Sequence, residues 1–225
     1  MLRTLGLATF LTLGGLALTG CAQNTTAGQQ AASGPQSTVD SAASTIGTMT
    51  NSAGAKSSAL LQQAKAVLIF PDLMKGGIGI GGSRGQGVLV ARTAKGWSDP
   101  AFYESTSVSL GLQLGLEESS VVMFVMSQKA LDTLLQPSSF TFKAGGGLSL
   151  ADFNSATQAQ LTGADVVIWS KSSGAFGGLT VSGTTVSQRT DNDMAYYQKP
   201  VSANDIIAGK VTNAGAHVLI SALGH

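Results

Sequence analysis

The feature that most constrains the fold of this 225-residue chain is a run of glycines from Gly76 to Gly87, which reads GGIGIGGSRGQG. Glycine weakens a strand, so a row of glycines marks a sharp bend or a close approach of another backbone. Gly77, Gly79 and Gly81 alternate with two isoleucines, which on a strand places the glycines on one face and the isoleucines on the other. The run therefore predicts a strand that bends and packs closely against its neighbours.

The same run matches two enzyme patterns. Gly77, Gly79 and Gly82 fit the dinucleotide fingerprint, and Ser83 is the serine of a G-x-S-x-G elbow. Both patterns need a helix directly after the glycines, whereas the following segment GVLVAR has the character of a strand. His217 is the only histidine inside the chain that could act as a base. We therefore expect a protein that is not an enzyme and that holds no cofactor.

Most of the chain beyond the glycine run has strand character. Apolar or alternating segments occur at 66–70, 87–92, 97–116, 120–127, 140–150, 164–170 and 177–188, with Glu117 and Glu118 as the expected turn of one hairpin. Helical patterns occur at 39–65, 127–136, 193–199 and 203–209. Together they predict an α+β fold with a mostly antiparallel, glycine-rich β core, either barrel-like or a sandwich, an N-terminal helical segment and a few short helices.

The N-terminal residues predict export and lipidation. Arg3 precedes an apolar run at 5–18 that is too short to cross a bilayer as a helix and is typical of a secretory signal. The run ends in LTGC, which resembles the bacterial lipobox, and Cys21 is the only cysteine. This resemblance implies cleavage before Cys21 and its acylation, for example with palmitate. Because Ala22 follows rather than aspartate, we expect an outer-membrane lipoprotein that faces the periplasm or the cell surface.

The expected domain organisation follows from these signals. Residues 1–20 form the cleaved signal peptide, and residues 21–37 form the lipidated N-terminus with an uncharged tether rich in Ala, Gln, Ser and Thr. Residues 38–225 are long enough for one domain with a sizeable core. The acyl chains would anchor this domain to a membrane without a transmembrane helix.

The charges are balanced in total but unevenly placed. The chain has 13 Lys and Arg against 12 Asp and Glu, so removal of Arg3 leaves equal numbers, which argues against nucleic-acid binding. Between Lys56 and Lys95, however, the sequence contains six basic residues and only one acidic residue, Asp72. This basic region either meets anionic headgroups or phosphates, or is an ordinary solvated face.

Metal sites have little support in the sequence. Two histidines and one cysteine cannot build a closed zinc shell. Asp191 and Asp193 could offer oxygens to a calcium ion, but their segment lacks the glycine and the bidentate glutamate of the calcium-loop motif. The preferred interpretation of this segment is a solvated turn that caps a helix. Whether a calcium ion binds near Asp191 and Asp193 stays an open alternative.

Several motifs together resemble the SYLF domain family. They are AKAVLIFPDLMKGGIGIGGSRGQGVLVAR at 64–92, a Trp-Ser-x-Pro at 97–100, GGGLSLA at 145–151, a Gly-x-Phe-x-Gly at 174–178 and DNDMAYY at 191–197. Asp99 departs from the family, where a small residue is common after Trp-Ser. The resemblance covers about residues 60–197 and implies a non-enzymatic module that binds membrane lipids, phosphoinositides in eukaryotic members. Actin binding, known for those members, is not carried over to a bacterial lipoprotein.

The basic N-terminal part of the SYLF family maps onto 56–95 in this chain. It implies five lipid-binding candidates: Lys65, Lys75, Arg84, Arg92 and Lys95. The expected function is therefore an envelope lipoprotein whose domain binds anionic, phosphoinositide-like headgroups without catalysis. The alternative is a structural or interaction protein of the envelope that grips a protein or glycan partner while the acyl anchor supplies all membrane contact.

Overall fold

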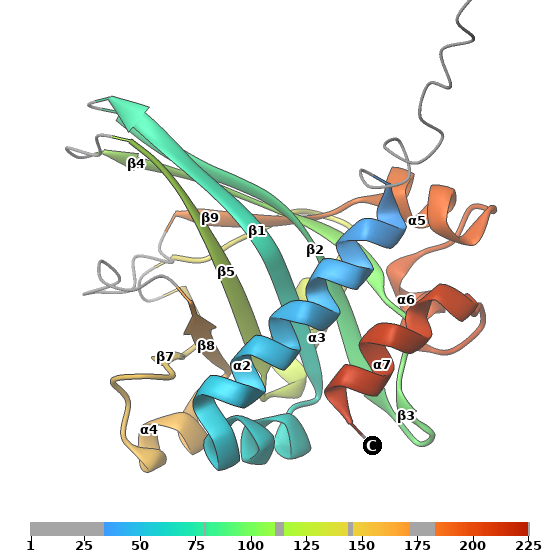
Figure 1. Cartoon of the computed structure of the whole chain (residues 1–225), viewed down its shortest axis with the longest axis horizontal. Coiled ribbons are helices and arrows are strands. Elements are labelled where there is room, and N and C mark those ends of the chain that lie inside the picture. Colours follow the sequence, from blue (N-terminus) through green and yellow to red (C-terminus); the bar gives the residue numbers. More distant parts are fainter. Residues whose placement is uncertain (1–33, 79, 111–114, 144–145, 172–182, 225) are drawn as a thin grey trace, which may run out of the picture.

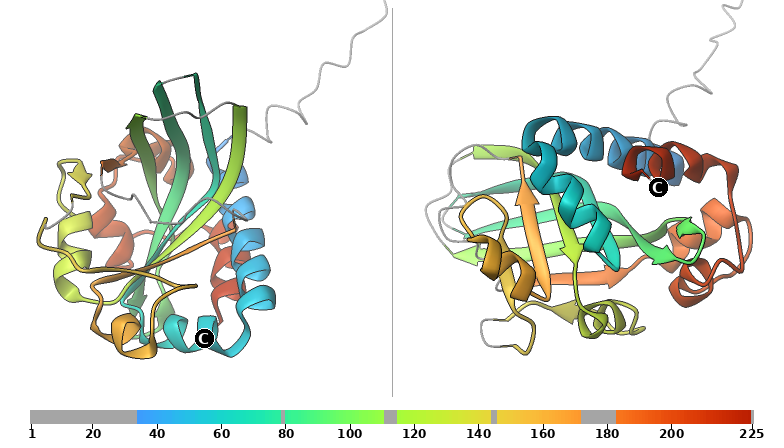
Figure 2. Two further views of the ribbon diagram at one scale, coloured as in Figure 1. Left: turned by 90° about the vertical axis from the view of Figure 1, so that its left-hand side faces the viewer. Right: turned by 90° about the horizontal axis from the view of Figure 1, so that it is seen from below.

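The computed structural model describes residues 34–78, 80–110, 115–143, 146–171 and 183–224, with the backbone alone at 75–78, 80–81, 108–110 and 115–117. A strongly curved sheet of nine strands forms its centre (Figures 1 and 2). The strands are β1 (Ala66–Ile78), β2 (Ile80–Thr93), β3 (Gly96–Trp97), β4 (Ala101–Leu110), β5 (Gly115–Val125), β6 (Phe140–Thr141), β7 (Leu150–Asp152), β8 (Val166–Ser170) and β9 (Thr184–Gln188).

The order of the strands is β6-β9-β4-β2-β1-β5-β8-β7, and β3 pairs with the end of β2. Every neighbouring pair is antiparallel except β7 and β8, which run parallel. The predicted α+β fold with a mostly antiparallel core is confirmed. The sheet has open edges at β6 and β7, so its shape is a half-barrel.

The helices are α2 (Pro35–Gln63), α3 (Gln128–Leu134), α4 (Gln158–Gly163), α5 (Thr190–Tyr197), α6 (Ala203–Ile207), the 3-10 turn η2 (Ala214–Ala216) and α7 (His217–Leu223). Helices α2 and α7 lie side by side on one face of the sheet (Figures 1 and 2). Ser127 and Ser202 cap α3 and α6 by accepting backbone N–H groups.

Helix α2 confirms the predicted N-terminal helical segment. Gly54 interrupts it at φ 54° and ψ −135°, a conformation that glycine adopts without strain, so the helix bends there. Its apolar face (Val39, Ala42, Ile46 and Met49) is completely buried against the rest of the domain. No helix within the described ranges combines the length and the apolar character needed to cross a bilayer.

Two predicted boundaries are wrong. The strand expected at 66–70 does not end at Phe70, because a bulge between Ile69 and Met74 accommodates Pro71 and β1 continues to Ile78. Glu117 and Glu118 lie inside β5 and pair with β1 rather than forming a turn. Glu118 is exposed, so the sheet carries its charge at no burial cost.

The long strand predicted at 140–150 is also wrong. β6 and β7 form at its two ends, and of the described residues between them, 142–143 and 146–149, none belongs to a strand. The backbone N–H of Phe142 still donates to the Thr184 carbonyl, which extends the pairing with β9 by one residue. Gly146 and Gly147 lie between the two strands, and glycine weakens a strand.

The glycine run forms a hairpin rather than one continuous strand. Gly76 pairs with Gly82 and Gly77 with Gly81, so glycines meet across β1 and β2, while Gly79 lies outside the described residues. The predicted close approach is confirmed further along β2. A Cβ atom added to Gly85 would lie 2.5 Å from the Asp72 carbonyl oxygen, and one added to Gly87 would collide with the Ile69 carbonyl. The β1 bulge therefore presses onto β2 where only glycine fits.

Candidate functional site

Three of the five predicted lipid-binding residues gather at one end of the sheet, where β1 begins and β2 ends. The carbonyl of Lys65 accepts the backbone N–H of Arg92 at 2.7 Å, and Lys95 lies in the turn between β2 and β3. Lys65 and Lys95 are exposed, and neither has an ion-pair partner among the described residues. We call Lys65, Arg92 and Lys95 the basic rim.

Arg92 also has a structural task within the basic rim. Its Nη2 donates to the Leu61 carbonyl at 2.8 Å, and its guanidinium lies 3.8 Å from the centre of the Trp97 ring. Partial burial lowers the pKa of Arg92, but a guanidinium stays charged in a protein. Arg92 therefore joins the end of α2 to the β2–β3 turn while contributing positive charge to the surface.

We expect Arg92→Lys to lower the free energy of unfolding by about 1–2 kcal/mol, because lysine keeps the charge but loses the planar stacking on Trp97 and the fixed hydrogen bond to Leu61. Urea denaturation followed by circular dichroism measures this difference. The exposed Lys95→Ala is the control and should change stability by less than about 0.5 kcal/mol. Equal stability of Arg92→Lys and the parent chain would contradict a structural task for Arg92.

The other two candidates lie away from the basic rim. The stretch of β2 between Arg84 and Arg92 spans about 26 Å, so Arg84 belongs to the opposite half of the sheet. Lys75 lies in β1, where it pairs with Ser83 of β2 and Glu117 of β5, and its side chain lies outside the described residues. The structure therefore brings together only three of the five candidates.

Arg84 is the first member of a charge chain with alternating signs. Its Nε donates to Glu104, and the other carboxylate oxygen of Glu104 lies 3.3 Å from Nη1 of Arg189. Arg189 in turn holds Asp191 with hydrogen bonds of 2.9 and 2.7 Å. The charge of Arg84 is thus partly compensated although its side chain is 72% exposed. This makes Arg84 a weaker candidate for headgroup contact than Lys65 or Lys95.

The two aspartates that could have held calcium have separate internal partners. The Arg189 hydrogen bonds lower the pKa of Asp191 to about 2. Asp193 is fully buried, its Oδ1 accepts the backbone N–H of Phe102 at 2.8 Å, and burial raises its pKa to about 7. Within the described ranges, no three His, Cys, Asp or Glu side chains come together as metal ligands would.

Ser83 and His217, the two residues that a serine-hydrolase interpretation would use, lie in β2 and α7. Ser83 lies in β2 with strand on both sides, and its Oγ is 2.7 Å from the Oγ of Ser107 on the paired strand β4. His217 is exposed at the start of α7, and its Nδ1 is 2.9 Å from the Oγ of Ser221. Each side chain is partnered locally, and Ser83 is followed by strand rather than by the helix that a nucleophile elbow needs.

The motif residues behind the SYLF resemblance form a scaffold next to the basic rim. Ser98 Oγ accepts the backbone N–H of Ala91 at 3.0 Å, and the hydroxyl of Tyr197 donates to the Pro100 carbonyl at 2.9 Å. Asp99, the departure from the family pattern, accepts the backbone N–H of Asn213 at 2.6 Å. The loop from β3 to β4 is thereby tied to α5 and to the segment before α7.

Comparison with known proteins agrees with these motifs. A family model described as Ysc84, Las17-binding protein actin regulator, matches residues 106–225, which is more than half of the chain. No solved structure matches the chain.

Similar curated proteins come from fungi and mammals. SH3 domain-containing protein PJ696.02 of Schizosaccharomyces pombe is 28% identical over 165 residues, covering 70% of this chain and 38% of that protein. LAS seventeen-binding protein 3 of Saccharomyces cerevisiae is 28% identical over 160 residues, covering 68% and 34%. SH3 domain-containing YSC84-like protein 1 of Homo sapiens is 26% identical over 159 residues, covering 67% and 45%. The chain thus matches less than half the length of these relatives. It belongs to the Ysc84 family, whose domain is also called SYLF.

Proposed function

We propose that this domain binds anionic lipid headgroups through the basic rim, without catalysis, and that an acylated Cys21 holds it at the outer membrane. The observation that carries the proposal is the pair of exposed lysines, Lys65 and Lys95, on either side of Arg92 without acidic partners among the described residues. Phosphoinositide-like headgroups fit such a rim because they offer several negative charges within a small area.

Binding of this kind is weak for the isolated domain. Each basic residue close to an anionic surface contributes about 1 kcal/mol, so three contribute about 3 kcal/mol, which corresponds to a dissociation constant above about 1 mM. An acyl anchor raises the effective concentration of the domain at the membrane to the millimolar range. The anchor and the basic rim together therefore give a domain that touches the membrane for much of the time.

The contact should be electrostatic rather than apolar. The apolar face of α2 is fully buried against the rest of the domain, so it cannot enter a bilayer while α2 stays packed. Charge contacts of exposed residues are screened by salt, with a Debye length of about 8 Å at physiological ionic strength. We therefore expect vesicle binding to fall steeply as salt is raised.

Flotation with vesicles tests the proposal. Because the expected dissociation constant is in the millimolar range, the unacylated chain from residue 22 onward is mixed with vesicles at about 10 mM accessible lipid and low salt. It should float with vesicles that contain phosphatidylserine or a phosphoinositide, and not with neutral vesicles. Lys65→Glu with Lys95→Glu should abolish flotation. Lys143→Glu with Lys199→Glu changes the net charge equally at two other exposed lysines and should leave it intact. Absence of flotation at any salt concentration, or equal loss in both double variants, would contradict binding through the basic rim.

A protein partner is the second candidate, and it is favoured by the names of the relatives. LAS seventeen-binding protein 3 is named for binding Las17, and the family description calls its members actin regulators. For this chain the corresponding role would be to grip an envelope protein, with the acyl anchor supplying all membrane contact. If the unacylated chain binds none of the vesicles while the acylated chain still resides in the membrane, binding of a protein partner replaces lipid binding as the proposed function.

A further inference from the structure

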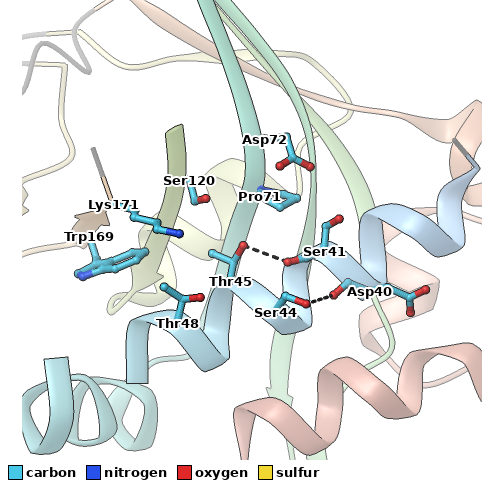
Figure 3. Close-up of a pocket in the computed structure, with 10 residues that line it drawn as sticks. All are labelled: Asp40, Ser41, Ser44, Thr45, Thr48, Pro71, Asp72, Ser120, Trp169 and Lys171. Carbon is cyan, nitrogen blue, oxygen red and sulfur yellow. Dashed lines mark hydrogen bonds between the residues drawn. The ribbon is translucent and has the colours of Figure 1, made fainter. Parts of the chain in front are cut away.

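A groove separate from the basic rim lies between the first half of α2 and the sheet (Figure 3). Its volume is about 310 Å³, at the lower end of the range for small-molecule sites. One wall is a polar strip on α2 that includes Asp40, Ser41, Ser44 and Thr48. These residues recur at steps of three and four, so they share a helix face next to the buried apolar one.

The rest of the groove comes from three strands that are far apart in the sequence. The β1 bulge contributes Pro71 and Asp72, β5 contributes Ser120, and the end of β8 contributes Trp169 with Lys171 just beyond it. Figure 3 shows Lys171 and the Trp169 indole together at one end, and Asp72 and Asp40 toward the other. The bulge that presses on the β2 glycines therefore also shapes this groove.

The groove offers many hydrogen-bond acceptors. The Ser44 hydroxyl donates to the Asp40 carbonyl at 3.1 Å, which leaves its own oxygen free to accept. The hydroxyls of Ser41, Thr48 and Ser120 have no hydrogen-bond partner among the described residues. Oδ1 of Asp40 already accepts from Nε2 of Gln36 at 2.8 Å, so the acceptors left for an occupant are Asp40 Oδ2, the Asp72 carboxyl group and these hydroxyl oxygens. They favour a donor-rich occupant, either water or a ligand with several hydroxyl or amine groups.

Charge limits the class of ligand. Asp40 and Asp72 would repel a phosphate, and burial together with the nearby Glu118 already raises the pKa of Asp72, which shows that more negative charge is unfavourable there. A purely apolar ligand would cover the hydroxyls without satisfying them, which costs free energy. This separates the groove from the basic rim, which favours anions.

We propose that the groove along α2 binds a carbohydrate of one or two sugar units. Sugar hydroxyls would donate to Asp40, Asp72 and the serine oxygens, and would accept from the ammonium of Lys171. Trp169 is only 5% exposed, so a sugar ring would contact the exposed edge of its indole rather than stack on its face. The proposal does not rest on lipid binding, because it uses none of the basic-rim residues.

A nuclear magnetic resonance titration tests this with five defined probes: glucose, galactose, mannose, glucosamine and N-acetylglucosamine. The chain has two tryptophans, so Trp97 beneath Arg92 is an internal reference for Trp169. We expect at least one sugar to shift the Trp169 indole N–H signal saturably, with a dissociation constant of about 1–10 mM. The Trp97 signal should not move.

Matched variants locate the binding. Ser44→Phe fills the groove from an exposed helix position, and Asp72→Ala removes an acceptor from the other side; each should weaken the best sugar at least about tenfold. Ser58→Phe makes the same change at an exposed position of α2 outside the groove and should leave the affinity within about twofold. Lys65→Glu with Lys95→Glu should also leave it unchanged. If no sugar gives a saturable shift, or if Ser44→Phe binds as well as the parent chain, the proposal is overturned.

Discussion

Replacing Gly87 with alanine is expected to lower the free energy of unfolding by about 3 kcal/mol. The added Cβ would collide with the Ile69 carbonyl oxygen and lie 2.5 Å from Cδ1 of Phe70, which has no exposed surface and cannot move freely. Relief would require a shift of the β1 bulge, which also supports Pro71 and Asp72. Urea denaturation of the two chains, monitored by circular dichroism, measures the loss.

The control for this substitution is Gly47→Ala in α2. No atom lies within 4 Å of the position that its Cβ would occupy, and glycine inside a helix is less favourable than alanine. We expect Gly47→Ala to raise the free energy of unfolding by about 0.5–1 kcal/mol. If Gly87→Ala were as stable as the parent chain, the β1 bulge would not press on β2 as described.

A second large effect is expected from Asp193→Asn, and it depends on pH. Burial raises the pKa of Asp193 from 3.8 to about 7, so between these values the folded chain holds a proton that the unfolded chain releases. The stability from the protonated form is present in full below about pH 4 and is lost as the pH rises through about 7. Asparagine keeps an oxygen for the Phe102 N–H but carries no charge, so it avoids this loss.

The expected difference follows from the size of the pKa change. A rise from 3.8 to about 7 corresponds to as much as about 4 kcal/mol between pH 4 and pH 8, so Asp193→Asn should gain stability over the parent chain across that window. Thermal melts of both chains at several pH values measure it. Asp132→Asn, at an exposed helix position, is the control substitution. A difference between Asp193→Asn and the parent chain that does not change with pH would contradict a raised pKa for Asp193.

Sequence reasoning succeeded where local patterning and tertiary packing agree. The glycine alternation correctly predicted strands packed against another backbone, because only glycine fits beside the Asp72 carbonyl at Gly85. Sequence reasoning ended the first strand at Phe70, because the proline that follows usually ends a strand. In the structure the β1 bulge removes the need for the N–H that Pro71 lacks, and the strand continues. Sequence reasoning also missed helix α7. Its short segment AGAHVLISAL becomes helical when Leu219 and Leu223 pack into the core.

The candidate site was only partly predictable, because a list of basic residues contains no distances. Arg84 and Arg92 lie on the same strand, yet about 26 Å of extended backbone, measured along β2, lies between them. The stacking of Arg92 on Trp97 depends on the β2–β3 turn, which pairs these two residues. No sequence pattern pointed to the groove along α2, because its walls come from α2, β1, β5 and β8 and meet only in the folded chain.

The family motifs were the most informative signal. They placed the chain among SYLF domains, which the family match over 106–225 confirms. The Trp-Ser-x-Pro and DNDMAYY motifs are structural, since the Tyr197 hydroxyl holds the Pro100 carbonyl in the loop before β4. The Gly-x-Phe-x-Gly motif at 174–178 lies outside the described residues. The residues that we propose for binding, Lys65 and Lys95, flank this scaffold.

The most direct test of membrane contact through the basic rim uses an environment-sensitive fluorophore. The chain from residue 22 onward has no cysteine, so a single introduced cysteine carries the label uniquely. Ala94 is exposed next to Lys95, and Thr106 is exposed on β4 opposite Arg84 in the other half of the sheet. With anionic vesicles at low salt, the label on Ala94→Cys should shift to the blue, and the label on Thr106→Cys should not. A blue shift at Thr106→Cys alone, or at neither position, would contradict binding through the basic rim.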